Sequence, residues 1–280
     1  MEKTGIIWTG KTWNPVSGCK QVSAGCAFCY AKTIAEKFKG QAFPNGFDLT
    51  LRPHKLNDPY KWKEPAIIFV NSMSDFFWDE IPKEYKLKIL EVIRDNPRHE
   101  FQILTKRSKK MMEFSYEHNL PDNFWAGVTI ENKKSLKRLE HLKNTRAHIK
   151  FISAEPLLSD LGDDYSLNGI DWIITGGESG NHLWKEKWQS ERGLVVYNYD
   201  ISKWVVKSEA VNWINNILDK SRKSHTAFFH KQWGGDYPEA AGRLLNGKTY
   251  NEMPVKCRLS NTNEYLEKIE KDKEKTLFSE

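Results

Sequence analysis

The chain has 280 residues, of which 39% are hydrophobic and 12% aromatic, so it can bury a large core and is not disordered. No run approaches the roughly 18 apolar residues of a membrane span, and residues 1–4 lack the apolar stretch of a signal peptide, so we expect a cytoplasmic protein with no membrane partner. Lys and Arg outnumber Asp and Glu by 43 to 37, a formal charge of +6 that is too mild to indicate nucleic-acid binding by itself.

Residues 19–29 form a loop that carries three of the four cysteines, Cys19, Cys26 and Cys29, and runs into a predicted helix. Such short spacing lets the sulfur atoms converge on one inorganic centre. Three protein ligands leave one iron of an iron-sulfur cube open, whereas a structural zinc site normally closes with four ligands. A reducing compartment would keep these thiols free of disulfides. The loop therefore predicts an iron-sulfur cluster with an open position.

The other elements follow a βα rhythm. Residues 5–18 suit a first strand, and Tyr30, Ile34 and Phe38 predict one apolar helical stripe after the cysteines. From residue 66 onward, short β-branched or aromatic runs alternate with amphipathic stretches, which is typical of a parallel sheet. Six further strands are predicted, at residues 66–70, 100–104, 124–130, 149–153, 171–175 and 226–230. We expect an α/β fold, a single (β/α) barrel or partial barrel of six to eight parallel strands.

The barrel-like domain is expected to span residues 1–260, with a Trp-, Lys- and Tyr-rich insertion at about residues 181–206. Residues 194–197 are a candidate extra strand within that insertion. Asn246 and Gly247 predict a C-terminal hairpin, because both residues tolerate positive φ. Residues 261–280 mix Lys and Glu, which predicts a charged tail with a solvated face.

Polar or charged residues directly follow each of the six later strands. In a parallel barrel, catalytic groups lie at the C-terminal ends of the strands. One such residue can simply cap the next helix, as Asp75 or Ser108 would, but six in succession indicate a site. The candidates at these strand ends are Ser72, Ser74, Asp75, Lys106, Arg107, Glu131, Glu155, Gly176, Gly177, Glu178 and Lys231.

Several motifs resemble known families. The stretches at residues 13–19, 70–75, 104–107, 153–157, 176–179 and 231–235 are similar to those of the phage and bacterial three-Cys-motif family. The cysteine pattern C-x6-C-x2-C, with Phe28 before the last cysteine, resembles a variant of the C-x3-C-x2-C motif of radical S-adenosylmethionine (SAM) enzymes. The first gap is longer here than in that motif.

The resemblance implies a radical-SAM-like fold in which Cys19, Cys26 and Cys29 ligate a 4Fe-4S cluster. With an electron donor, the reduced cluster would cleave SAM to a 5'-deoxyadenosyl radical. By position, it also implies a set of SAM contacts: Ser72, Ser74 and Asp75 to the methionine moiety, Phe28 to adenine, and Thr129 or Glu131 to ribose. Glu155, Gly176 and Gly177 are further candidate cofactor contacts. Because Gly176-Gly177-Glu178 follows the sixth strand rather than the second, cofactor binding, substrate binding and a tight turn all remain open.

Lys106, Glu178 and Lys231 are the candidate catalytic residues. Together with Arg107, the two lysines would surround the proposed mouth, which predicts an anionic substrate such as a phosphate, a nucleotide or a nucleic acid. Lys106 and Arg107 are equally compatible with a structural place on the next helix. The resemblance implies no particular substrate.

Two other interpretations stay open. In the first, Cys257 completes a zinc site in a protein that binds nucleic acid, although it is distant in sequence and isolated cysteines usually pack as small hydrophobes. In the second, the chain is a non-catalytic, cluster-binding subunit of a partner protein. Trp184, Trp188 and Trp204 suit base stacking or core packing.

Overall fold

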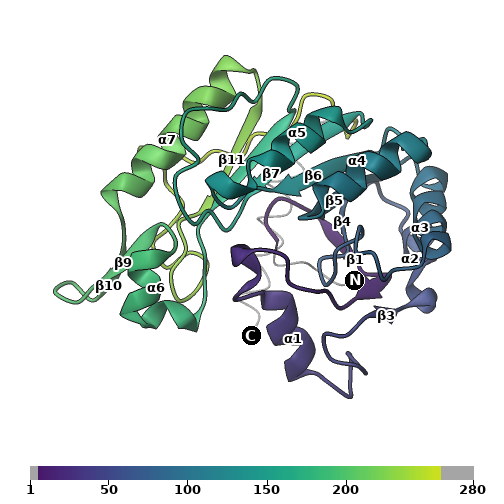
Figure 1. Cartoon of the computed structure of the whole chain (residues 1–280), viewed down its shortest axis with the longest axis horizontal. Coiled ribbons are helices and arrows are strands. Elements are labelled where there is room, and N and C mark those ends of the chain that lie inside the picture. The colour runs from purple at the N-terminus through teal and green to yellow at the C-terminus, as the bar shows by residue number, and fades with distance from the viewer. Residues whose placement is uncertain (1–5, 260–280) are drawn as a thin grey trace.

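A computed structural model describes residues 6–259. Its centre is a sheet of seven parallel strands in the order β1-β4-β5-β6-β7-β8-β11, which curves into an arch (Figure 1). The predicted partial barrel of parallel strands is therefore confirmed. The strands are β1 (Lys11–Trp13), β4 (Ile67–Val70), β5 (Glu100–Thr105), β6 (Phe124–Thr129), β7 (Ile149–Ala154), β8 (Trp172–Gly176) and β11 (Ala227–Gln232).

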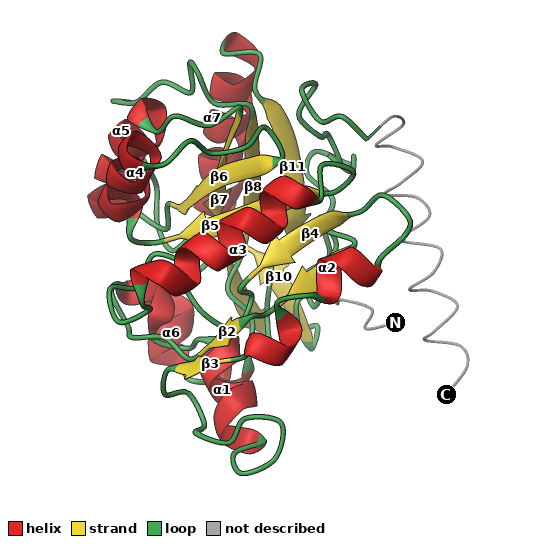
Figure 2. Cartoon of the chain, turned by 90° about the vertical axis from the view of Figure 1, so that its right-hand side faces the viewer, coloured by secondary structure: helices red, strands yellow, loops and turns green. Residues whose placement is uncertain are grey.

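Four helices cover the outer face of the arch: α3 (Lys83–Asp95), α4 (Ser108–Glu117), α5 (Lys137–Asn144) and α7 (Ser208–Lys223) (Figures 1 and 2). Their amphipathic pattern explains this placement, because each contributes apolar side chains to one large core shared with the strands. The short α2 (Asp58–Lys61) lies in the irregular segment before β4. No helix within residues 6–259 is both long and apolar enough to cross a membrane.

Both faces of the sheet are buried, because alternate residues of each strand enter different cores. Ile68 and Val70 of β4 join the helix-covered core, whereas Ile67 and Phe69 join a second core on the inner face. The inner core is rich in aromatic residues, and segments from both ends of the described chain complete it, including Trp8. Because both faces pack in apolar cores, the candidate polar side chains lie at the carboxyl edge of the sheet.

The cysteine segment lies on the open side of the arch (Figure 1). It follows β2 (Val16–Ser17), which pairs with β3 (Thr50–Leu51), and it leads into α1 (Tyr30–Lys37). The predicted apolar stripe of α1 is not buried: Tyr30, Ile34 and Phe38 are exposed. The helix instead buries Ala31 and Ala35 against Met73 and its neighbours, since only small side chains allow that close approach.

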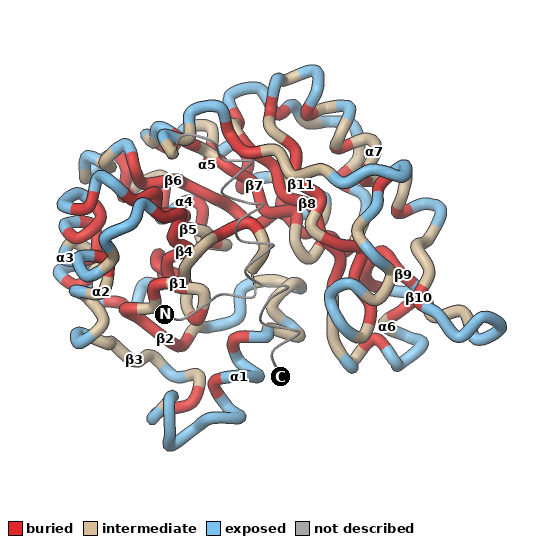
Figure 3. Tube along the Cα trace, turned by 180° about the vertical axis from the view of Figure 1, so that it is seen from behind, coloured by how far each residue is buried: buried red, intermediate tan, exposed pale blue. Residues whose placement is uncertain are grey.

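The segment predicted as an insertion forms α6 (Glu186–Glu191) and an antiparallel hairpin of β9 (Val195–Asn198) and β10 (Lys203–Val206). The expected extra strand is thus observed as β9. Figure 3 shows that the tip of this hairpin is exposed. The predicted C-terminal hairpin is reduced to a tight turn at Asn246 and Gly247, with one bridge between Leu245 and Lys248. The predicted charged tail lies outside the described residues.

Candidate functional site

The start of the cysteine loop is fixed to the end of β4. Gly18 N donates to the Met73 carbonyl at 3.0 Å, and the Ser74 hydroxyl donates to the Gly18 carbonyl at 2.6 Å. A side chain at Gly18 would place its Cβ 2.2 Å from the Asp48 carbonyl oxygen, and φ is +89°, so only glycine fits. This packing aims Cys19 at the carboxyl edge of the sheet.

The three thiols are free and half-buried. Cys26 ends the short 3-10 helix Ala24–Cys26, and Cys29 is the N-cap residue of α1, as the sequence predicted for a cysteine loop that leads into a helix. Burial raises the pKa of Cys19, and the nearby Asp75 charge adds to this effect, while Arg107 opposes it. Within residues 6–259 the structure gathers no three His, Cys, Asp or Glu side chains closely enough to hold a metal ion.

The donor set itself suits an iron-sulfur cluster rather than a four-cysteine zinc site. Cys257 packs against the inner core, where burial raises the pKa of its thiol to about 11 and the Glu100 charge adds to this effect. Glu100 begins β5, whereas Arg107, which contacts Cys19, follows its end. Because a six-residue strand is about 17 Å long, the predicted alternative in which Cys257 completes a zinc site is wrong.

Asp75 holds the end of β5 rather than facing a cavity. It accepts hydrogen bonds from the Thr105 hydroxyl at 2.7 Å and from Lys106 N at 3.2 Å, and it pairs with Arg107 at 3.0 Å. Arg107 in turn donates to the Lys20 carbonyl at 3.0 Å and lies 3.7 Å from the Cys19 sulfur. A predicted SAM contact therefore has its carboxylate committed to the protein.

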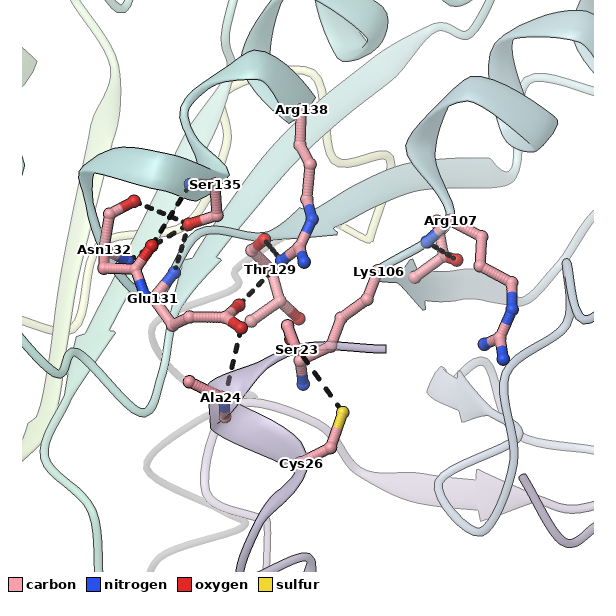
Figure 4. A network of polar contacts seen from close by, with 12 residues as sticks. Ser23, Ala24, Cys26, Lys106, Arg107, Thr129, Glu131, Asn132, Ser135 and Arg138 are labelled. Carbon is pink, nitrogen blue, oxygen red and sulfur yellow. Dashed lines mark hydrogen bonds and ion pairs between the residues drawn. The ribbon is translucent and has the colours of Figure 1, made fainter. Parts of the chain in front are cut away.

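Glu131 makes a second charge pair next to the cysteine loop (Figure 4). Its carboxylate is fully buried, accepts from Arg138 at 2.6 Å and accepts from Gly25 N at 3.3 Å. Burial opposes its ionisation, but hydrogen bonding from Ser23 and the charges of Arg138 and Lys106 hold the pKa of Glu131 below its usual value. The carboxylate predicted to contact ribose thus supports the loop backbone.

A capping box fixes the backbone of Glu131. The side chain of Asn132 accepts from Ser135 N, and the Ser135 hydroxyl accepts from the backbone amides of Glu131 and Asn132. This motif starts the short helix Lys133–Ser135 directly before α5, the helix that carries Arg138.

Glu178 makes a third pair. Arg192 donates two hydrogen bonds to its carboxylate, at 2.6 and 2.8 Å, and one to the Ala24 carbonyl at 3.1 Å. His182 also approaches the carboxylate, with 3.2 Å between Nε2 and Oε2, and its ring stacks on Phe28 with 3.7 Å between ring centres. Phe28, predicted to contact adenine, is thus packed against the insertion, and Glu178 is occupied by Arg192.

The two glycines before Glu178 serve close backbone packing. A Cβ on Gly177 would lie 1.8 Å from the Trp233 carbonyl oxygen, and Gly177 N donates to the Gln232 carbonyl. A Cβ on Gly176 would lie 3.3 Å from the Glu155 side chain. Of the three roles left open by the sequence, a tight backbone approach is the one that this packing explains.

The remaining predicted residues lie on the inner side of the same edge. Lys231 of β11 forms an ion pair and hydrogen bond with Glu155, which follows β7. Thr129 is buried and its carbonyl accepts from Arg138 at 2.7 Å. Lys106 is half-buried, extends toward the cysteine loop in Figure 4 and forms no ion pair within residues 6–259.

Ser72 and Ser74, which follow β4, connect the end of this strand to neighbouring segments by hydrogen bonds. The Ser72 hydroxyl donates to Asn14 at 3.1 Å, and its carbonyl accepts from the Tyr30 hydroxyl at 2.7 Å. Ser74 holds Gly18, as described above. These two of the three predicted methionine contacts therefore link the strand to the segment that carries the cysteines.

An open hollow of about 480 Å³ reaches Cys19 from the side of β3. Its lining includes neither Glu131 nor Glu178. The residues that line it are Cys19, Lys20, Phe47, Asp48, Leu49, Trp78 and Glu80.

Arg138 and Arg192 were not predicted from the sequence. Arg138 lies four residues before Leu142, on the apolar side of α5, and a cation on that side was a usable signal of a buried partner. Arg192 follows α6 in the insertion and carries no comparable signal, because its partners Glu178 and Ala24 are distant in sequence.

Solved structures of spore photoproduct lyase are similar to this chain. The structure complexed with dinucleoside spore photoproduct is 11% identical, with a TM-score of 0.48 over 79% of this chain and 74% of that one. A double mutant with bound AdoMet and dinucleoside spore photoproduct is 11% identical, with a TM-score of 0.47 over 81% of this chain and 76% of that one. No curated protein matches the chain.

One family model, described as "Protein of unknown function (DUF5131)", matches residues 3–192. The matched part contains the three loop cysteines and the charge pairs of Asp75, Glu131 and Glu178. The chain therefore belongs to the DUF5131 family.

Proposed function

We propose that this protein is a radical SAM-type enzyme in which Cys19, Cys26 and Cys29 ligate a 4Fe-4S cluster. The observation that carries the proposal is the position of three free thiols, on one loop, at the carboxyl edge of a parallel partial barrel. The fourth cysteine lies at the other end of the strands, which leaves three ligands and one open iron. The motifs similar to those of the three-Cys-motif family support the same conclusion.

When bound, such a cluster supplies the electron that cleaves SAM to methionine and a 5'-deoxyadenosyl radical. The chain's own residues would place the substrate and exclude water. Glu155 and Lys231, Thr129 and Lys106 lie on the inner side of the carboxyl edge and are the side chains best placed to contact SAM or substrate. Asp75, Glu131 and Glu178 act by holding the loop, because each is already paired with an arginine.

The charge pairs also reduce the number of cations that are available to bind an anionic substrate. Arg107 and Lys231, two of the three cations expected at the mouth, are neutralised by Asp75 and Glu155. Lys106 is then the cation best placed to bind one anionic group, such as a phosphate of a nucleotide or nucleic acid. An electron donor is required as a partner for turnover.

The test is anaerobic reconstitution with iron and sulfide, followed by reduction in the presence of SAM. We expect about four irons and four sulfides per chain, and formation of 5'-deoxyadenosine. Cys26→Ala should abolish both, whereas Cys257→Ala should change neither, because Cys257 lies at the opposite end of the strands.

The outcomes separate the alternatives. A cluster without any SAM cleavage would favour a non-catalytic cluster-binding subunit. Stoichiometric zinc that withstands iron reconstitution, or iron binding that Cys26→Ala leaves intact, would overturn the proposal.

A further inference from the structure

The six residues between Cys19 and Cys26 are attached to the strand ends at several points. The Lys20 carbonyl accepts from Arg107, the Ala24 carbonyl accepts from Arg192, and Gly25 N donates to Glu131. These three partners follow β5, follow α6 and follow β6, respectively. The extra length of the first gap is thus the part of the motif that docks on the scaffold.

Each attachment is charge-assisted and comes from an arginine–carboxylate pair; the bonds to Ala24 and Gly25 are part-buried, whereas the bond to Lys20 is exposed. Glu131 is fully buried and Glu178, the partner of Arg192, is 6% exposed. Hydrogen bonds to ionised groups are about twice as strong as neutral ones, and burial limits competition from water. Three such bonds can offset the entropy lost when a short loop is held in one conformation.

The attachments also reach the cysteine side chains. The Ser23 hydroxyl, which lowers the pKa of Glu131 by hydrogen bonding, lies 3.9 Å from the Cys26 sulfur. Phe28, next to Cys29, contacts both His182 and Arg192, whose guanidinium carbon is 5.2 Å from the ring centre. The backbone on both sides of Cys26 is therefore fixed by Glu131 and by the pair of Glu178 with Arg192.

We infer that residues 20–25 are a docking segment that preorganises the cysteine loop before any cluster binds, with Glu131 and Arg192 as its positioning residues. The identity of the bound group rests on the proposed function, whereas the order of the metal-free loop does not. Preorganisation matters because a metal or cluster that must also order its loop binds more weakly.

The experiment uses full-length, metal-free protein kept reduced with a chelator present. Hydrogen exchange of residues 20–29 and the rate of alkylation of Cys26 are followed by mass spectrometry. Glu131→Gln and Arg192→Met should each raise amide exchange in this segment about tenfold, the effect of losing one hydrogen bond to a charged group. Arg192→Lys keeps the charge and should restore part of the protection.

The matched control is Glu252→Gln. Glu252 also accepts two hydrogen bonds from an arginine, Arg222, at 2.6 and 2.7 Å, but it lies beside the start of β11 and away from the loop. It should leave exchange in residues 20–29 unchanged. Ser23→Ala provides a second variant that does not threaten the core, because Ser23 is only half-buried; it should raise Cys26 alkylation several-fold.

The inference would be overturned if exchange and alkylation stay unchanged in Ser23→Ala and also in Glu131→Gln or Arg192→Met, whichever of these two folds. A fall in the iron content of these variants would not alter that conclusion. Faster exchange limited to residues 20–29 supports it, even if the wild type never binds a cluster. If exchange is faster only in residues 20–29 and the wild type is colourless, the proposed function is refuted but the docking segment is supported.

Discussion

Arg107 lies between Cys19 and Asp75, with its guanidinium 3.7 Å from the sulfur and 3.0 Å from the carboxylate. Arg192 likewise joins a carboxylate, that of Glu178, to the cysteine loop, whereas Arg138 pairs with Glu131, which bonds the loop itself. Only Arg107 approaches a sulfur atom directly. The loop is therefore surrounded by neutralised pairs, which leaves little free charge to repel an anionic cluster.

The first prediction concerns Asp75. Asp75→Asn should lower the free energy of unfolding by about 3 kcal/mol, because it leaves the buried Arg107 guanidinium without its counter-charge. Reconstituted iron content should fall as well, since Arg107 would lose the contact that aims it at Cys19. Urea unfolding and iron analysis of the same preparation check both effects.

Asp79→Asn is the control for this prediction. Asp79 also pairs with a cation at 3.0 Å, Lys110, but both side chains are more than half exposed. Water screens such a pair, so stability and iron content should both stay near wild type. Equal effects of the two substitutions would show that the Asp75 pair has no special role.

The second prediction separates Lys106 from Lys231. Lys106→Met should weaken binding of a dinucleotide about tenfold and lower the unfolding midpoint only slightly, because Glu131, whose ionisation the Lys106 charge favours, keeps its ion pair with Arg138. Lys231→Met should instead destabilise the fold by about 1–2 kcal/mol, because it leaves Glu155 largely buried and unpaired. Fluorescence anisotropy and urea unfolding measure the two quantities. A loss of dinucleotide affinity in Lys231→Met alone would contradict the assignment of Lys106.

The third prediction tests the Gly176-Gly177-Glu178 motif. Gly177→Ala should destabilise the protein by about 3 kcal/mol, because its Cβ would overlap the Trp233 backbone carbonyl and force the backbone to shift. Gly40→Ala, where nothing lies within 4 Å but φ is +76°, should cost only about 1 kcal/mol from backbone strain. A Gly177→Ala protein of wild-type stability that fails to bind SAM would point instead to a cofactor contact.

The sheet was predictable because its strands are buried on both faces. Continuous apolar runs such as residues 66–70 signal such strands, and the polar residues that follow them mark the carboxyl edge without knowledge of tertiary contacts. The helix α1 was predicted correctly from its apolar stripe, but the stripe is not the face that packs against the protein. Its period was read correctly as helical, but Ala31 and Ala35 face the protein because only they fit against Met73.

The pairing of the strand-end charges was not predictable. Glu131 and its partner Arg138 are seven residues apart, but Arg192, the partner of Glu178, lies 168 residues from Ala24, whose carbonyl it also contacts. Residue type identified the carboxylates as important, and a ligand-binding role was the natural expectation. Long-range packing decides instead that three of them are occupied by arginines.

The last prediction concerns pH. His230 is fully buried, and burial, aided by the Arg243 charge, lowers its pKa to about 3. The ordinary pKa of histidine is about 6.5. Below this pH the unfolded chain binds a proton at His230 and the folded chain does not, so the free energy of unfolding decreases as the pH falls. The contribution of His230 amounts to about 1.4 kcal/mol per pH unit, or about 2 kcal/mol between pH 6.5 and 5.

His230→Gln removes the titrating ring from this position, so the pH dependence of its unfolding free energy between pH 7 and 5 should be flatter than that of the wild type by this amount. The exposed His148, changed in the same way, serves as the control, because its side chain stays in water on folding. Urea unfolding at several pH values measures both variants. Parallel pH profiles for wild type and His230→Gln would mean that the folded protein accepts a proton at His230, in spite of its burial between Thr175 and Trp233.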